Sequence, residues 1–331
     1  MTPELIPLIR AAGSHREVGA QIGEATADAV RRAAGEHFDA AVVEAYRAVT
    51  LEHLPWIVEE LEAVGEAGGV DPLAVFAASI EELQPAEAPA RCTDLLLTRE
   101  GRALVGHNND LYASDEEDVV AIEWRVPGEP VVFTLGTGPW ISVGWNDAGL
   151  SVTGNEVAPN DERVGIPRLL QVRDVLTRRT LDEAVEAILH PARASSYNWV
   201  LADASGRALN VEGSAASARS SGPNDTGALV HTNHYVHEEM LALERTSTDG
   251  SRIRLRRAEE LLAGREEPVT TAWLREALSD HEGAPDSLCR HRDAEGVKTV
   301  FWCVADVTAG EIVYGRGNPC SSVAQVHRFE T

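Results

Sequence analysis

The chain changes character at one stretch, RCTDLLLTREGRALVGHNND, residues 91–110. Two apolar runs flank the turn TREGR, which predicts a β-hairpin. Cys92 stands at the head of the first run. As a structural residue it would be a small buried hydrophobe, which is the usual state of a free cysteine. As a functional residue it would be a nucleophile that becomes the first residue of a mature chain when the bond after Arg91 breaks.

The residues before this stretch have the spacing of helices. Apolar positions recur every three or four residues over 14–46, and a second periodic run, 54–68, ends at glycine. A third helix is expected from Pro72, with Asp71 as its N-cap. Two prolines in QPAEAPAR then end the helical region. The sequence therefore predicts a helical leader over residues 1–91.

The residues after the leader alternate between strand blocks and helix pairs. Short β-branched or alternating runs predict strands at 93–98, 103–108, 119–126, 131–136, 140–145, 150–157, 196–203, 208–213, 228–235, 299–306 and 311–317. Helical patterns fall at 167–179, 181–190, 251–264 and 272–280. This order is typical of an α+β fold in which two antiparallel sheets pack face to face with helix layers outside, a four-layer αββα sandwich. No shift in composition marks a boundary, so one structural domain is expected.

Composition and charge indicate which kinds of binding partner the protein can have. The 331 residues carry 53 acidic and 29 basic side chains, a formal net charge of −24, which argues against a nucleic-acid partner. The N-terminus lacks a basic segment followed by an apolar core, and no apolar run is long enough to span a bilayer. We therefore expect a cytoplasmic protein with no membrane partner. The oligomeric state is left open.

The cysteines and histidines do not have the spacing of a metal site. The four cysteines are Cys92, Cys289, Cys303 and Cys320. They are dispersed, without a CxxC pair or zinc-ribbon spacing, so reduced thiols are expected, the last three buried and inert. A zinc set of His231, His234 and His237 is disfavoured, because residues three apart in a strand point to opposite faces. Asp280, His281 and Glu282 suggest acid–base chemistry, but a turn at the end of a helix explains them equally well. The sequence predicts no metal and no cofactor.

A nucleophilic Cys92 would supply two catalytic groups at once. Its thiol could attack the carbonyl of Arg91 and form a thioester that water opens, leaving Cys92 with a free α-amine. Such an amine titrates near ~7.7–8.0, close to working pH, where a general base is most useful. The predicted hairpin brings Asn108 and Asp110 beside the start of the first strand, so that Asp110 can reach this amine. Taken alone, GHNND is better explained as a polar turn with Asx hydrogen bonds.

The chain resembles the family of the acyl-coenzyme A:6-aminopenicillanic acid acyltransferase, which are self-cleaving N-terminal-nucleophile enzymes classed with the cysteine peptidases. More remote relatives are choloylglycine hydrolases and acid-ceramidase-like amidases. The segments that carry the resemblance are GSHREVGAQIGE, RCTDLLLTREGRALVGHNND, WNDAGLSVTGNEV, PRLLQVRDVL, PARASSYNWVLADASGRALNVEGS, HTNHY, SDHEGAPDSLCRH and GNPC, in that order from residue 13 to residue 320. The resemblance implies the αββα fold of N-terminal-nucleophile hydrolases, in one domain cut into residues 1–91 and 92–331.

The resemblance also implies roles for single residues. Cys92 matches the nucleophile of the family, and the bond between Arg91 and Cys92 matches its autoproteolytic site. Asp110 matches the acidic residue beside the nucleophile. Asn233 matches the asparagine whose amide faces the oxyanion, where a neutral donor stabilises a tetrahedral intermediate without competing for protons.

The resemblance also implies positions that contact substrate. At two further positions the chain departs from the family pattern. Candidates for substrate contact are Asn155, Ser214, Arg290 and Lys298. Arg91 stands where the fungal enzyme has glycine, which more readily adopts the strained backbone that cleavage needs. His107 stands where several relatives have arginine, so a cation beside Asp110 would come from elsewhere. Arg290 and Lys298, the chain's only lysine, are candidates, each also explained as a rim charge or a structural ion pair.

The function that the resemblance implies is acyl transfer through a Cys92 thioester. The substrate is a small-molecule acyl amide or acyl thioester. Water as acceptor makes the enzyme an amidohydrolase, and an amine acceptor makes it an N-acyltransferase. Two alternatives stay open: an uncleaved thiol hydrolase that uses Cys92 with a histidine such as His107, and a catalytically inactive binding module on the same fold.

Overall fold

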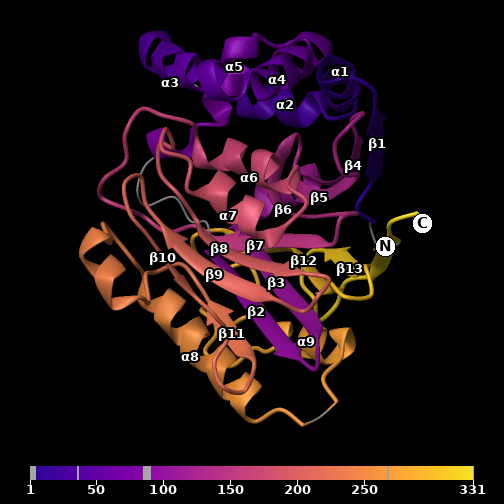
Figure 1. Cartoon of the computed structure of the whole chain (residues 1–331), viewed down its shortest axis with the longest axis vertical. Helices are drawn as coiled ribbons and strands as arrows, with labels where there is room; N and C mark the ends of the chain where they lie inside the picture. The colour runs from indigo at the N-terminus through magenta and orange to yellow at the C-terminus, as the bar shows by residue number, and fades with distance from the viewer. Residues whose placement is uncertain (1–4, 36, 85–90, 267, 331) are drawn as a thin grey trace.

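The computed structural model describes residues 5–35, 37–84, 91–266 and 268–330, arranged in four layers (Figure 1). Two β-sheets lie face to face, and helices cover the outer face of each. This is the αββα arrangement expected from the order of strand blocks and helix pairs. Within the described residues, none of the helices combines the length and the apolar composition that crossing a bilayer requires.

The leader is divided more finely than its periodicity suggests. It contains the helices α1 (His15–Ala25), α2 (Ala27–Ala33), α3 (Ala40–His53), α4 (Pro55–Gly68) and α5 (Pro72–Ala78), and the 3-10 helix η1 (Glu81–Leu83). The single helix expected over 14–46 is wrong. α1 ends at Thr26, whose hydroxyl donates to the carbonyl of Ile22, and α3 begins after Asp39, whose carboxylate accepts the N–H of Ala41. The helical run is therefore interrupted at Thr26 and again before Ala40, where Asp39 caps the start of α3.

The strands form one sheet of eight and one of six. The first contains, in spatial order, β1 (Leu8–Ala12), β4 (Val119–Arg125), β5 (Val132–Thr137), β6 (Trp140–Asn146), β7 (Leu150–Asn155), β8 (Asn198–Asp203), β9 (Ala208–Gly213) and β10 (Ala218–Ser221). The second contains β11 (Ala228–His231), β2 (Arg91–Arg99), β3 (Arg102–Tyr112), β12 (Val297–Asp306), β13 (Glu311–Arg316) and β14 (Gln325–Arg328). Among the described strand pairs, β1–β4 alone is parallel.

Apolar side chains fill the spaces between the four layers. The remaining helices are α6 (Arg168–Leu176), α7 (Leu181–Ile188), α8 (Asp249–Ala263) and α9 (Thr271–Leu278), with the 3-10 helices η2 (Ala113–Asp118) and η3 (Glu238–Leu243). Phe133 of the first sheet and Phe301 of the second belong to the core between the sheets. The helices α8 and α9 bury Leu262 and Leu274 against the outer face of the second sheet.

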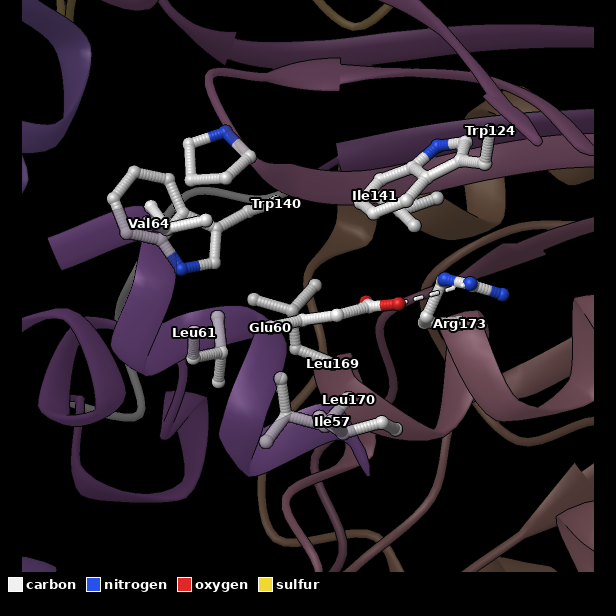
Figure 2. A pocket seen from close by; sticks show the side chains of 11 residues that line it. Ile57, Glu60, Leu61, Val64, Trp124, Trp140, Ile141, Leu169, Leu170 and Arg173 are labelled. Atoms are coloured by element: carbon white, nitrogen blue, oxygen red, sulfur yellow. Dashed lines mark hydrogen bonds and ion pairs between the residues drawn. The ribbon is translucent and has the colours of Figure 1, made fainter. Parts of the chain in front are cut away.

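The leader shares a core with the first sheet rather than forming a unit of its own. Ile57 of α4 belongs to the same buried cluster as Trp124 and Ile141 of the sheet. Figure 2 shows the mostly apolar pocket at this interface, with Glu60 of α4 directed toward Arg173 of α6. Their charged groups lie 3.0 Å apart, and each side chain is 5% exposed. The leader therefore packs against the rest of the chain through a shared core and a buried ion pair, and β1 pairs with β4 of the first sheet.

Candidate active site

The hairpin of β2 and β3 fixes the surroundings of Cys92. In its register Cys92 lies opposite Asn109, and Arg91 lies opposite Asp110. Because side chains alternate across a sheet, Cys92 and Asn109 project between the sheets, as Leu96 does. Arg91 and Asp110 project toward the layer of α8 and α9. The hairpin prediction is confirmed, and the thiol of Cys92 and the carboxylate of Asp110 lie on opposite faces of the sheet.

The neighbouring strand β11 brings Asn233 to Cys92. β11 runs antiparallel to β2 with His231 opposite Asp94, so the chain beyond His231 continues alongside the start of β2. There the backbone N–H of Cys92 donates to Oδ1 of Asn233 over 2.7 Å. The Nδ2 of Asn233 donates to the carbonyl of Glu156 over 3.0 Å. Asn233 thus joins the backbone of Cys92 to the residue that follows β7.

The thiol of Cys92 is buried in the uncut chain. Its residue is 6% exposed, and Sγ lies 3.7 Å from Oδ1 of Asn109. Burial raises the pKa of the Cys92 thiol, and the neighbouring His107 offsets this only in part. The thiol is therefore protonated near neutral pH, and a base has to activate it before it can attack a carbonyl.

His107 is paired with the carboxylate of Asp94 and also lies beside the Cys92 thiol. Its Nδ1 lies 3.0 Å from Oδ1 of Asp94, and its Nε2 lies 3.3 Å from Oδ1 of Asn109. Burial alone would lower the pKa of His107, but the Asp94 carboxylate outweighs burial and raises it well above the usual value. An imidazole that already holds its proton is a poor base for the Cys92 thiol.

The carboxylate of Asp110 lies among cations on the helix-facing side of the sheet. Thr299, opposite it on β12, donates its hydroxyl to Oδ1 of Asp110 over 2.7 Å. Burial raises the pKa of Asp110 to about 6, although the positive charges of Arg254 and Arg290 and the Thr299 hydroxyl oppose the rise. Asp110 therefore titrates within reach of neutral pH.

Arg254 of α8 connects these groups, and sequence reasoning missed it. Its Nη1 donates to the carbonyl of Cys92 over 2.5 Å and to Oγ1 of Thr93 over 2.9 Å. Its Nη2 donates to Oδ1 of Asn233 over 3.0 Å. The residue is fully buried, and its charge is the first to oppose the rise in the pKa of Asp110. Arg254 is thus a cation near Asp110 that was not among the expected candidates, and of those candidates Arg290 also acts on the charge of Asp110.

The pKa of Asp110 predicts a pH-dependent cost of folding. Its pKa is 3.8 when exposed and about 6 when folded, so the folded state binds this proton more tightly. Stability should therefore fall as pH rises from about 4 to about 6, by up to about 3 kcal/mol. We expect urea unfolding of Asp110→Asn to lack this part of the pH dependence. The comparison is made in a Cys92→Ala background, so that both chains are uncut. Parallel curves for the two chains between these pH values would contradict the assignment.

A polar cluster between the sheets surrounds Asn155 at the end of β7. Its Oδ1 lies 3.1 Å from Nδ1 of His231, whose Nε2 lies 2.8 Å from Oε1 of Glu212. Its Nδ2 is buried and has no hydrogen-bond partner among the described residues. A buried donor without a partner is unusual in a folded protein and is free to bind a substrate oxygen. His234 and His237 make separate contacts, with a serine of α8 and with η3.

The structure places the remaining candidates apart from Cys92. Arg290 is buried and pairs with two aspartates of its own loop, close enough to Asp110 to act on its charge. Lys298 pairs with Glu116 over 2.8 Å, and the Ser214 hydroxyl donates to Asp161 over 2.8 Å. Within the described contacts, the structure therefore brings together Cys92, Asn233 and Asp110 through Arg254. It does not bring Ser214 or Lys298 to them.

Comparisons with known proteins show the family to which the chain belongs. The sequence model of the family described as acyl-coenzyme A:6-aminopenicillanic acid acyl-transferase matches residues 97–320. The 40 kDa form of the acyl-coenzyme A:6-aminopenicillanic-acid-acyltransferase of Emericella nidulans is 27% identical over 210 residues, which is 62% of this chain and 57% of that protein. The match thus spans little more than half the length of this curated relative.

One solved structure shows a likeness of fold. A variant of the conjugated bile acid hydrolase from Clostridium perfringens has a TM-score of 0.50 and 16% identity, over 72% of this chain and 97% of that chain. The penicillin V acylase from Agrobacterium tumefaciens has a TM-score of 0.43 and 14% identity, over 68% of this chain and 82% of that chain. The likeness to the bile acid hydrolase is one of architecture, two sheets enclosed by helices.

Proposed function

Because the chain belongs to the acyl-coenzyme A:6-aminopenicillanic acid acyltransferase family, we propose that it is a self-cleaving N-terminal-nucleophile enzyme that transfers acyl groups through Cys92. The observation that carries the proposal is the hydrogen bond from the Cys92 N–H to Asn233, 2.7 Å long, at the start of a central strand. This nitrogen becomes the α-amine after cleavage. The contact therefore supports a prepared position for the amine that is to act as base.

Self-cleavage would begin with the thiol. Sγ of Cys92 attacks the carbonyl of Arg91, the bond to the nitrogen of Cys92 breaks, and the thiol proton passes to that nitrogen. Water then opens the thioester, leaving a carboxylate on Arg91 and a free thiol and amine on Cys92. Arg254 supports this step because it donates to the carbonyl of Cys92 and holds Oδ1 of Asn233, which keeps the nitrogen in place.

Acyl transfer would reuse the same atoms. The α-amine takes the proton from the Cys92 thiol, Sγ attacks the substrate carbonyl, and the leaving amine or thiol departs with a proton. Asn233 is assigned as the donor to the oxyanion. In the uncut chain its Nδ2 donates to the carbonyl of Glu156, so the substrate oxygen would share or replace that acceptor. The unpartnered Nδ2 of Asn155 is a second donor for substrate.

An acyl-enzyme adduct tests this function directly. The processed protein is incubated with simple acyl amides and acyl thioesters, and its intact mass is followed after acid quenching. We expect the mass of one acyl group to appear on the 92–331 chain and to map to Cys92. Added amines should then divide the acyl group between hydrolysis and N-acylation. An adduct on another residue, or turnover without any need for Cys92, would contradict the proposal.

The uncleaved thiol hydrolase remains as a second mechanism. Burial raises the pKa of the Cys92 thiol, and among the groups that lower it His107 has the largest effect. In that mechanism a thiolate and an imidazolium form a pair, and residue 92 keeps its peptide bond. N-terminal sequencing separates the two. A free α-amine on Cys92 in the active protein excludes the uncleaved mechanism.

The leader should stay bound after cleavage. Its helices share a core with the first sheet, the ion pair of Glu60 and Arg173 is buried, and β1 pairs with β4. We expect residues 1–91 and 92–331 to elute together in size-exclusion chromatography, at the volume of the uncut Cys92→Ala protein. They should separate only in denaturant. Elution of 92–331 alone under native conditions would show that the leader is released instead.

A further inference from the structure

A second group of reactive side chains lies at the surface end of α9. It contains His281 just after α9, Cys289 and His291 in the loop that follows, and Cys320 just after β13. One ligand atom from each of the four residues lies within 4.8 Å of every other. The thiol of Cys289 is buried, whereas the other three residues are exposed. Cys320 is therefore not the buried residue that its sequence context suggested.

Three of the six distances within this cluster lie near those of a tetrahedral zinc site, and all six are within 4.8 Å. Sγ of Cys289 lies 3.6 Å from Sγ of Cys320, which lies 3.6 Å from Nε2 of His291. The Nε2 atoms of His281 and His291 are 3.0 Å apart. Zinc bonds of ~2.3 Å to sulfur and ~2.0–2.1 Å to nitrogen give tetrahedron edges of roughly 3.8, 3.6 and 3.4 Å for the S–S, S–N and N–N pairs. A disulfide would need its sulfurs at ~2.05 Å.

We infer that His281, Cys289, His291 and Cys320 bind one zinc ion in a closed, structural site. Two thiolates and two imidazoles complete a tetrahedron, and this S₂N₂ set selects zinc over the hard cations that prefer oxygen. All four positions are filled by protein, so the ion has no open position for a substrate. The site is separate from the acyl-transfer chemistry proposed for Cys92.

The surroundings of the cluster have the features of an outer shell. Nδ2 of Asn318 donates to Sγ of Cys289 over 3.5 Å and to the carbonyl of Arg290 over 2.8 Å. The N–H of Cys289 donates to the carbonyl of Asp280 over 2.9 Å, which fixes the two ends of the loop to each other. Such contacts orient ligands and compensate thiolate charge at zinc sites.

The ion would hold the loop that carries Arg290. Arg290 stands between the ligands Cys289 and His291, and its backbone N–H donates to Oγ1 of Thr299 over 3.1 Å. That hydroxyl donates in turn to Asp110. Arg290 is thus a positioning residue, and zinc would act on the proposed active site only through the order of this loop.

Metal content is the primary test. The untagged protein is expressed in a Cys92→Ala background, which removes the proposed nucleophile as a ligand, and is purified without chelator. We expect elemental analysis to find about one zinc per chain. Cobalt(II) exchanged into the site should show the visible absorption and the thiolate charge-transfer bands of a tetrahedral S₂N₂ site. Both measurements are independent of catalysis, so a failure of the zinc inference can be told apart from a failure of the proposed function.

Matched variants locate the ion. Cys320→Ser and His291→Ala alter exposed ligands, so they should fold and yet lose most of the bound metal and the cobalt spectrum. Cys303→Ala and His53→Ala remove one thiol and one imidazole outside the cluster and should keep both. Undiminished zinc in Cys320→Ser would overturn the inference. So would a metal-free chain lighter by two hydrogens, because that mass identifies a disulfide between Cys289 and Cys320.

Discussion

We expect Cys92→Ala to leave the chain whole and inactive. The wild-type protein, denatured and weighed intact, should yield two fragments that meet between Arg91 and Cys92, whereas the variant yields one full-length chain. The reason is that the proposed cleavage and the proposed turnover use the same sulfur. Acyl transfer should fall by at least about a thousandfold, as it does when other covalent enzymes lose their nucleophile.

Two matched variants make this result specific. Cys303→Ala removes another buried thiol of the same sheet and should process normally. Cys92→Ser keeps a weaker nucleophile at the same atom and should process slowly. Cleavage that continues in Cys92→Ala would show that another group, or another protein, cuts the chain. An uncut wild-type chain would remove the proposed general base and leave the thiol and His107 as the remaining mechanism.

Asn233→Ala is expected to have the second largest effect. Asn233 contacts the nitrogen of Cys92 through Oδ1 and is assigned to the oxyanion through Nδ2. Loss of one such donor lowers turnover by about 10²–10³-fold in enzymes that stabilise tetrahedral intermediates. The rate is measured per processed molecule, from a time course of intact mass, so that slow cleavage is not counted as slow turnover.

Asn233→Asp is the matched control for this experiment. It keeps an oxygen that can accept from Cys92 and from Arg254, but it lacks the amide N–H. If the donor matters, Asn233→Asp should turn over as poorly as Asn233→Ala while it processes better. Recovery of turnover in Asn233→Asp would show that the residue serves only to hold the nitrogen of Cys92.

The periodicity of apolar residues predicted most of the fold. Each sheet is buried on both faces, so most of its strands carry a strong apolar pattern in the sequence. The strands that periodicity missed have weak patterns for physical reasons. β10 is exposed along most of its length, and β14 buries a single residue, so neither alternates clearly. β1 pairs in parallel with β4, more than a hundred residues away, and nothing local marks such a contact. β10 lies within the polar segment SAASARSSGPNDTG, residues 214–227, whose composition is typical of a surface loop.

Strand register explains only part of the candidate site. The resemblance to the family singled out Cys92 and Asn233, and the pairing of β2 with β3 and β11 explains why they lie together. Arg254 could not be predicted, since a helix rich in arginine does not reveal which one is buried. The four-residue cluster at Cys289 was missed for a similar reason. Its fourth residue, Cys320, follows β13 and is distant in sequence from the other three. No short spacing between cysteines and histidines therefore indicates the cluster.

The core shared by the leader and the first sheet has a consequence for refolding. While the chain is whole, this core forms within one molecule. Once the bond before Cys92 is cut, complete unfolding would separate two polypeptides, and their reassembly would become a bimolecular reaction whose yield depends on concentration. The precursor would then regain its structure in dilute solution, whereas the mature protein would not. Persistence of the mature form would be set by how slowly it unfolds, a kinetic property fixed at the moment of maturation.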